Sequence, residues 1–173
     1  MDEEYRMPKL PVTKLSPVDH YLAGSWEALG AGAPVLVALA QLCSQSMVDG
    51  LAANPASAEG LMPEAKAILV AARKRGVIEV RGVNTAFDPA ARMLALYVEI
   101  DVTQTIAFRD ANEPEITIRF LEGFRQLCAL GLVMHHLHRD FSLSTSGFEV
   151  AKMIRRADVQ AWLDKGSEFG LHD

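Results

Sequence analysis

Histidines cluster near the C-terminal end of the sequence, at His135, His136 and His138, and a carboxylate follows at Asp140. If this segment is a β-strand, His136, His138 and Asp140 point to the same face, because successive side chains alternate between the two faces of a strand. Two imidazoles and a carboxylate at this spacing can bind one divalent metal ion. The first candidate site is therefore a metal centre on His136, His138 and Asp140.

The ligand set of that candidate metal centre is incomplete. A structural zinc ion takes four protein ligands, and a catalytic zinc ion normally takes three with a water molecule. His20 and Glu149 are the remaining candidates, and nothing in the sequence ties either of them to the cluster. We therefore favour a hairpin with a polar outer face, in which His135, Leu137 and Phe141 pack inward, and we predict no metal and no cofactor.

The two cysteines, Cys43 and Cys128, are the candidate nucleophiles. Neither lies in a glycine-flanked elbow or in a known catalytic cysteine signature. We expect both to be reduced and buried, because an unpaired cysteine behaves as a small apolar side chain. The sequence also contains no phosphate-binding loop, dinucleotide fingerprint, zinc-protease motif or Gly-x-Ser-x-Gly elbow. We therefore predict a protein that is not an enzyme.

A short run of cations, Arg73, Lys74 and Arg75, is followed by Arg81. Such a basic patch can contact phosphate or an acidic partner. Cations are also common in the last turn of a helix, where they lie close to the negative end of the helix dipole. Gly76 directly follows the run and indicates that a helix ends there, so a solvated helix end is the more ordinary interpretation.

The whole chain has 173 residues and a formal net charge of −5. Because a general nucleic-acid binder usually presents a basic face, we expect no strong binding to nucleic acid. The charged segment Met1–Arg6 has no apolar stretch behind it, unlike an export signal, which favours a cytoplasmic protein. Residues 28–48 carry no charge, but Gly30, Gly32 and Pro34 interrupt the start of this segment. We therefore expect a buried helix there and no membrane span.

The hydrophobic pattern predicts one mainly helical α+β domain over residues 16–166, between an extended arm at 1–15 and a frayed tail at 167–173. Ser16 is the expected cap of the first helix. The next helix should run from Pro34 to about residue 53 and be buried nearly all round, at the centre of the core.

The middle of the chain mixes helix and strand signals. A third helix should begin at Pro63 and a short strand should cover Val77–Arg81, while Asp88 and Pro89 indicate another helix start. Residues 94–108 show strand alternation in part and helical spacing in part. We favour a short helix that turns into a strand, because β-branched residues dominate the later positions.

The C-terminal half has clearer boundaries. Asn112, with Glu115 three residues later, predicts the cap of a strongly amphipathic helix. Two strands should follow, at 132–138 and 141–143, with a turn around residues 138–140. Ser144 or Thr145 should then cap a helix, and a last helix should end at Gly166. The order expected over residues 112–154 is therefore helix, two-stranded hairpin and helix.

Two sequence runs in this half resemble the latter part of a winged-helix domain. They read Leu127-Cys-Ala-Leu-Gly-Leu-Val-Met and Arg139-Asp-Phe-Ser-Leu-Ser-Thr-Ser-Gly-Phe-Glu-Val-Ala. In that family a helix ends at a Gly-Leu-Val or Gly-Leu-Ile step and enters a two-stranded wing, and a capped helix follows. The resemblance covers residues 112–154, about a quarter of the chain. A fainter echo from Arg75 to Pro89 is compatible with a tandem arrangement.

Winged-helix domains include DNA-binding and protein-contact modules, and the charges separate these two classes. A helix that reads DNA should present cations and donors, yet residues 112–130 carry two arginines and three glutamates. We therefore favour a regulatory or protein-interaction module that forms a homodimer, with an unknown protein partner. The first alternative is a transcription-factor-like DNA binder that uses Arg73–Arg81 or the wing. The second alternative is a small metal-dependent enzyme built on His136 and His138.

Overall fold

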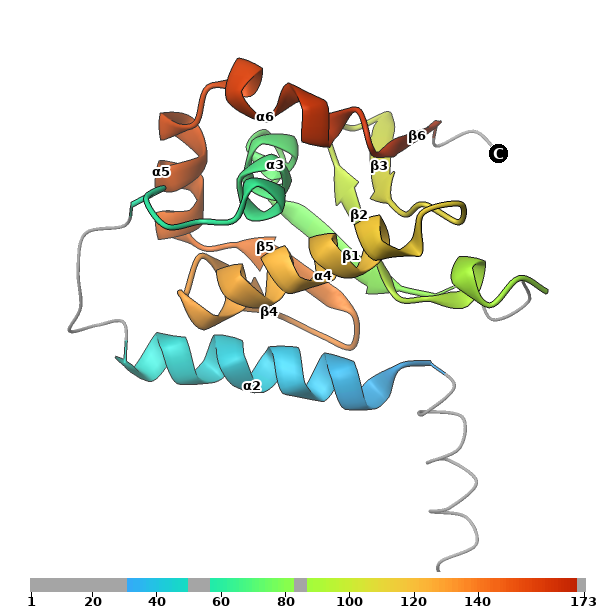
Figure 1. Ribbon diagram of the computed structural model, residues 1–173. Coiled ribbons are helices and arrows are strands. Elements are labelled where there is room, and N and C mark those ends of the chain that lie inside the picture. The colour runs from blue at the N-terminus through green and yellow to red at the C-terminus, as the bar shows by residue number, and fades with distance from the viewer. Residues whose placement is uncertain (1–30, 50–56, 83–86, 171–173) are drawn as a thin grey trace, which may run out of the picture.

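The computed structural model describes residues 31–49, 57–82 and 87–170. These residues form an α+β fold in which helices contribute more residues than strands (Figure 1). The predicted arm at 1–15 and the helix capped by Ser16 lie outside the described residues. The helices are α2 (Ala33–Asp49), α3 (Pro63–Ala72), the 3-10 helix η2 (Ala90–Arg92), α4 (Pro114–Ala129), α5 (Thr145–Met153) and α6 (Arg156–Leu163). The strands are β1 (Val77–Arg81), β2 (Ala95–Glu99), β3 (Gln104–Phe108), β4 (Val133–His135), β5 (Asp140–Leu143) and β6 (Ser167–Gly170).

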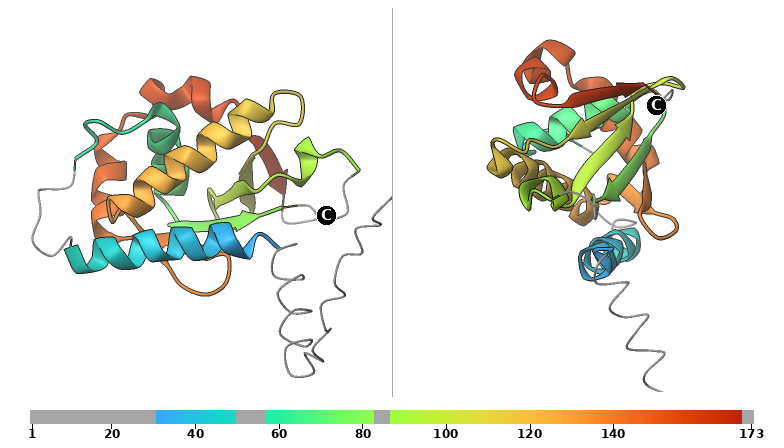
Figure 2. Two further views of the ribbon diagram at one scale, coloured as in Figure 1. Left: turned by 60° about the horizontal axis from the view of Figure 1, so that its bottom comes forward. Right: turned by 90° about the vertical axis from the view of Figure 1, so that its right-hand side faces the viewer.

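All six strands form one antiparallel sheet in the order β4-β5-β1-β2-β3-β6. Strand β1 lies inside the sheet, where Glu79 is opposite Tyr97 on β2 and opposite Asp140 on β5. Helices α3, α4 and α6 lie on one side of the sheet (Figures 1 and 2). The sheet therefore joins the hairpin near the C-terminus to strands from the middle of the chain.

Helix α3 is the central helix of the core, and eight of its ten residues are buried. It contacts α4, α5, α6 and β2. At the crossing with α4, a Cβ added to Gly123 would lie 2.8 Å from the backbone nitrogen of Ala65, so only glycine permits this approach. Glu64 is fully buried at the same crossing and forms an ion pair with Arg119 on α4. The close contact and the ion pair together fix α3 against α4.

The expectation that the second helix is buried nearly all round is wrong. Helix α2 packs against α4 and β4, and within its bounds only Leu39 and Cys43 are buried. Val37 and Val48 are exposed. The absence of charged residues indicates that a helix could be buried. It does not show that other parts of the same chain pack around that helix. Among the described residues, no helix combines the length and apolar character needed to cross a bilayer.

The expectation of a short helix turning into a strand at 94–108 is also wrong, because this segment forms the hairpin β2–β3. Residues 95–98 of β2 are all buried, so the polar alternation that identifies a half-buried strand is lost. The side chain of Asp101 closes the turn, since its Oδ1 accepts hydrogen bonds from the backbone nitrogens of Thr103 at 2.9 Å and Gln104 at 3.0 Å. This turn residue was the local signal for a hairpin.

The helix, hairpin and helix order over residues 112–154 is confirmed as α4, β4–β5 and α5. Ser144 is the predicted cap, and its Oγ accepts a hydrogen bond from the backbone nitrogen of Gly147 at 3.0 Å. Gly131 ends the preceding helix segment with φ +69°, as expected of a left-handed stop. The hairpin is part of the larger sheet, because β5 also pairs with β1.

Three boundary predictions need correction. Asn112 does not cap α4, whose cap position is Glu113; instead Asp110 Oδ1 accepts from the backbone nitrogens of Asn112 and Glu113, both at 2.9 Å. The helix start at residues 88–89 yields only the short η2. The tail expected to fray from residue 167 forms β6, which pairs with β3. Strand β6 pairs with a strand distant in sequence, so no local signal identifies it.

Truncation of Leu39 tests how firmly α2 is held to the core. Leu39→Ala should lower the free energy of unfolding by about 2–5 kcal/mol, because the side chain is only 3% exposed. Leu137→Ala is the matched control, since this leucine is 70% exposed, and it should change stability by about 0.5 kcal/mol or less. Urea unfolding measured by circular dichroism compares the two. Equal losses would contradict the packing of α2 described above.

Candidate functional site

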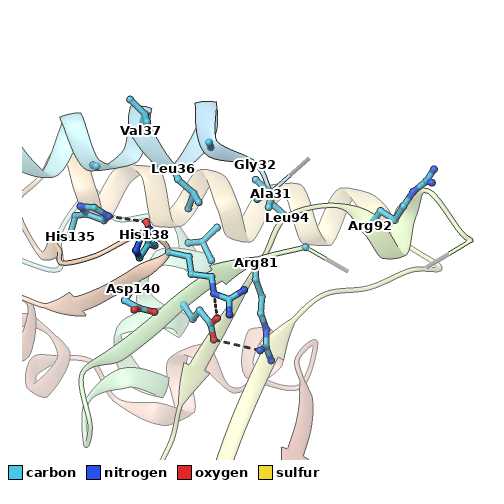
Figure 3. Close-up of a pocket in the computed structure, with 16 residues that line it drawn as sticks. Ala31, Gly32, Leu36, Val37, Arg81, Arg92, Leu94, His135, His138 and Asp140 are labelled. Carbon is cyan, nitrogen blue, oxygen red and sulfur yellow. Dashed lines mark hydrogen bonds and ion pairs between the residues drawn. The ribbon is translucent and has the colours of Figure 1, made fainter. Parts of the chain in front are cut away.

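A cavity of about 1210 Å³ lies between the N-terminal half of α2, strand β1 and the turn of the β4–β5 hairpin (Figure 3). The helix side of the cavity is apolar and includes Leu36, Val37 and Ala40. Across from it lie charged and polar side chains of the sheet and hairpin. They are Glu79, Arg81, His135, His138, Arg139 and Asp140. The cavity is therefore amphipathic, with one apolar wall and one charged wall.

Two guanidinium groups share one carboxylate on the charged wall. Glu79 Oε1 lies 2.6 Å from Nε of Arg139, and Glu79 Oε2 lies 3.6 Å from Nη1 of Arg81. The Arg81 guanidinium also lies 3.8 Å from the centre of the Tyr97 ring, a favourable cation–π contact. Glu79 and Tyr97 thus hold two cations in defined positions beside the cavity.

A third guanidinium, that of Arg109, lies close to this pair. Its Nη2 donates a hydrogen bond to the backbone oxygen of Arg81 at 3.2 Å. Its Nε and Nη1 are buried and have no hydrogen-bond partner in the part of the chain that the structure describes. Buried donors without partners are costly. Arg109 therefore has two N–H groups that could still donate hydrogen bonds.

Local folding explains how these residues meet. Glu79 and Arg81 are two positions apart on β1, so they point to the same face of the sheet. The hairpin turn brings Arg139 to them, because the backbone oxygen of Arg139 accepts a hydrogen bond from the nitrogen of Val80 at 3.0 Å. The turn itself includes His138 with φ +49°. The alternation of side chains along β1 was enough to predict from the sequence that Glu79 and Arg81 share a face. The position of Arg139 beside them could be seen only in the tertiary structure.

The structure corrects the geometry assumed for the histidine metal centre. Strand β4 ends at His135, so His136 and His138 lie in the turn and not at alternating positions of a strand. His136 Nε2 lies 2.7 Å from Oγ of Ser142, and His135 Nε2 lies 3.0 Å from the backbone oxygen of His138. No group of three potential metal ligands is brought together within residues 31–49, 57–82 and 87–170.

The remaining members of the histidine hypothesis are dispersed. His135 packs against Phe141 with ring centres 4.9 Å apart, as expected for inward-facing residues. Leu137 does not pack inward, because the turn leaves it exposed. Glu149 is exposed on α5, and His20 lies outside the described residues.

The predicted basic patch is split between the two ends of β1. Arg73, Lys74 and Arg75 precede the strand, and Arg75 Nε lies 3.3 Å from Oε2 of Glu99. Arg81 is the last residue of the strand and belongs to the cavity with Arg139. The structure therefore does not bring these four cations into one phosphate-binding patch.

The prediction that both cysteines are buried is confirmed. Their side chains form a hydrogen bond that joins α2 to α4. The hydrogen bond from Cys128 lowers the pKa of the Cys43 thiol, while the same bond and then burial raise the pKa of the Cys128 thiol. Ser46 adds to this attachment, because its Oγ donates to the backbone oxygen of Cys128 at 2.8 Å.

The thiol pair predicts an order of alkylation. Iodoacetamide should react with Cys43 before Cys128, because the thiolate is the nucleophile and the lowered pKa favours it on Cys43. Both reactions should be slow in the native protein and fast in denaturant, since both thiols are buried. Quenched time points followed by peptide mass spectrometry measure the order. Faster modification of Cys128 would contradict the arrangement.

Comparison of the chain with family models, with curated proteins and with solved structures finds no match. The contacts described above therefore supply the argument for function.

Proposed function

We propose that this chain is a non-enzymatic protein-interaction module that assembles with a second copy of itself through the exposed face of α2. One observation carries this proposal. The outer face of α2 is exposed over its whole length and carries no charge within residues 33–48, although charged residues make up 23% of the sequence. The exposed positions of α2 before Asp49 are Pro34, Val35, Val37, Ala38, Gln41, Ser44, Gln45, Met47 and Val48. An uncharged face of this length is unusual for a helix that only meets water.

The chemistry of this outer face favours an identical partner. Interfaces in soluble homodimers are commonly twofold, so that the same patch meets itself. Gln41 is the middle residue of α2 (Ala33–Asp49), and an antiparallel pair of helices centred on it places the two amides opposite one another. A glutamine amide has both donors and an acceptor and can therefore pair with itself. Ala38 and Ser44 are small enough for the two helices to approach closely.

The C-terminal half supports assignment to the winged-helix-like class as a protein-contact module. Its order of α4, β4–β5 and α5 agrees with that class. In this assignment β4–β5 is the wing, and the pairing of β5 with β1 makes it a rigid part of the sheet. Such a wing presents a fixed surface that a regulatory partner can contact.

Charge compensation on α4 argues against the DNA-binding alternative. Arg119 pairs with buried Glu64, and Arg125 Nη2 lies 2.9 Å from Oε2 of Glu122. A helix that reads the major groove needs donors directed toward the bases. Both arginines of α4 already have carboxylate partners within the protein.

Sedimentation velocity across a concentration series tests self-association. The wild-type chain should form a dimer, and Gln41→Glu should raise its dissociation constant by about tenfold or more, because two like charges would oppose one another at the centre of the interface. Gln104→Glu is the matched control, since it makes the same change at an exposed position on β3. A chain that stays monomeric, or equal effects of the two substitutions, would sink the proposal.

Duplex DNA titration tests the alternative. We expect no binding tighter than about micromolar at physiological salt. Fluorescence anisotropy with a labelled duplex over a salt series measures this affinity. Submicromolar binding that weakens steeply with salt, and disappears when Arg73, Lys74 and Arg75 are changed to alanine, would favour a DNA binder instead.

A further inference from the structure

We infer that the cavity between α2 and the β4–β5 hairpin is a binding site for a small organic anion with an apolar body, of the medium-chain carboxylate class. The cavity adjoins the proposed dimer contact at Val37, which lines the cavity and is also exposed on the outer face of α2, whereas Gln41 at the centre of that contact does not line the cavity. Its volume of about 1210 Å³ is larger than the roughly 300–1,000 Å³ usual for small-molecule sites. An entire small ligand therefore fits inside it.

The charged wall of the cavity determines the sign of the charge that a ligand should carry. Glu79 satisfies one nitrogen each of Arg81 and Arg139, and each guanidinium carries five N–H donors. Asp140 also lines the cavity, but it forms no ion pair with a described residue. Arg109 lies behind this wall and is not part of the cavity lining. Arg81, Arg92 and Arg139 line the cavity with Glu79 and Asp140, so the lining carries one more positive than negative charge, which a ligand carboxylate would balance.

The two arginines of the charged wall are also organised in advance. Glu79 lies against both guanidinium groups. The centre of the Tyr97 ring lies 3.8 Å from Cζ of the Arg81 guanidinium group. An anion that binds there does not have to order two flexible side chains, so less conformational entropy is lost on binding. Planar guanidinium groups suit a carboxylate because they can bind both of its oxygens.

The apolar wall of the cavity determines the chemical character of the uncharged part of the ligand. Leu36 of α2 and Leu94, which precedes β2, line the cavity, and Figure 3 shows Val37 directed away from the sheet and the hairpin. A small inorganic anion would leave these side chains in contact with water. An alkyl chain against them would be removed from water, and this burial stabilises the complex. The ligand class that matches both walls is therefore an amphipathic carboxylate.

Arg92 is a cavity residue that does not belong to the anion-binding group. Its side chain points away from Arg81 and from the hairpin histidines in Figure 3. The anchor of the carboxylate is thus assigned to Arg81 and Arg139. Arg139 is the better position to change, because its side chain is 55% exposed.

Isothermal titration calorimetry with decanoate, decanol and inorganic phosphate, all below micelle-forming concentrations, tests the site. Decanoate should bind at a single saturable site. Decanol, which has the same apolar body without the charge, should bind about tenfold more weakly or worse. Phosphate, which has the charge without the body, should give no saturable heat.

Variants assign the binding to the two walls. Arg139→Gln should weaken decanoate by about tenfold and leave decanol unchanged, while Leu36→Ala should weaken both ligands. Arg125→Gln on the exposed side of α4 is the matched control and should change neither ligand. Gln41→Glu should also leave decanoate binding intact, which separates this site from the proposed dimer contact. Circular dichroism establishes that each variant is folded.

Several results would overturn the inference. They are the absence of saturable decanoate binding, equal affinity for decanol, tight binding of phosphate alone, and equal effects of Arg139→Gln and Arg125→Gln. The last result would mean that the affinity for decanoate depends on the net charge of the protein and not on the residues of the cavity.

Discussion

The close approach of α3 to α4 is the contact on which the rest of the fold depends. Gly123 leaves space for the backbone of α3, and Glu64 is buried at the same place against Arg119. Strand β1 begins directly after Gly76, so the position of α3 sets the position of an inner strand of the sheet. Gly76 in turn leaves space for the ring of Phe148, since a Cβ there would lie 2.3 Å from Cζ of that ring. Displacement of α3 would therefore shift α4, β1 and α5 together.

Prediction from sequence succeeded where the signal is local. The bounds of Val77–Arg81, the helix start at Pro63 and the cap at Ser144 follow from neighbouring residues. It failed where burial comes from distant parts of the chain. Strand β2 is buried on both faces, so its alternation of apolar and polar residues is only partial, and α2 is apolar although its outer face is exposed.

The candidate site shows the same division between local and distant signals. The spacing of Glu79 and Arg81 on one strand face can be read from the sequence. Their common partner Arg139 lies far along the chain and meets them only because β5 pairs with β1. Histidine spacing was misleading for a related reason. The alternation assumed for His136 and His138 requires a strand that continues past residue 135, and the turn ends it there.

The short strand β4 has a consequence for how copies of this protein can meet. It lies at one edge of the sheet and is only three residues long, and α2 packs against it (Figure 1). Exposed edge strands invite pairing with another chain, and proteins resist this by shortening or covering the edge. Here the edge is both short and covered, so continuous cross-strand aggregation is blocked on this side. Helix α2 therefore covers this edge of the sheet, and removing it would leave the backbone groups of β4 open to pairing with another chain.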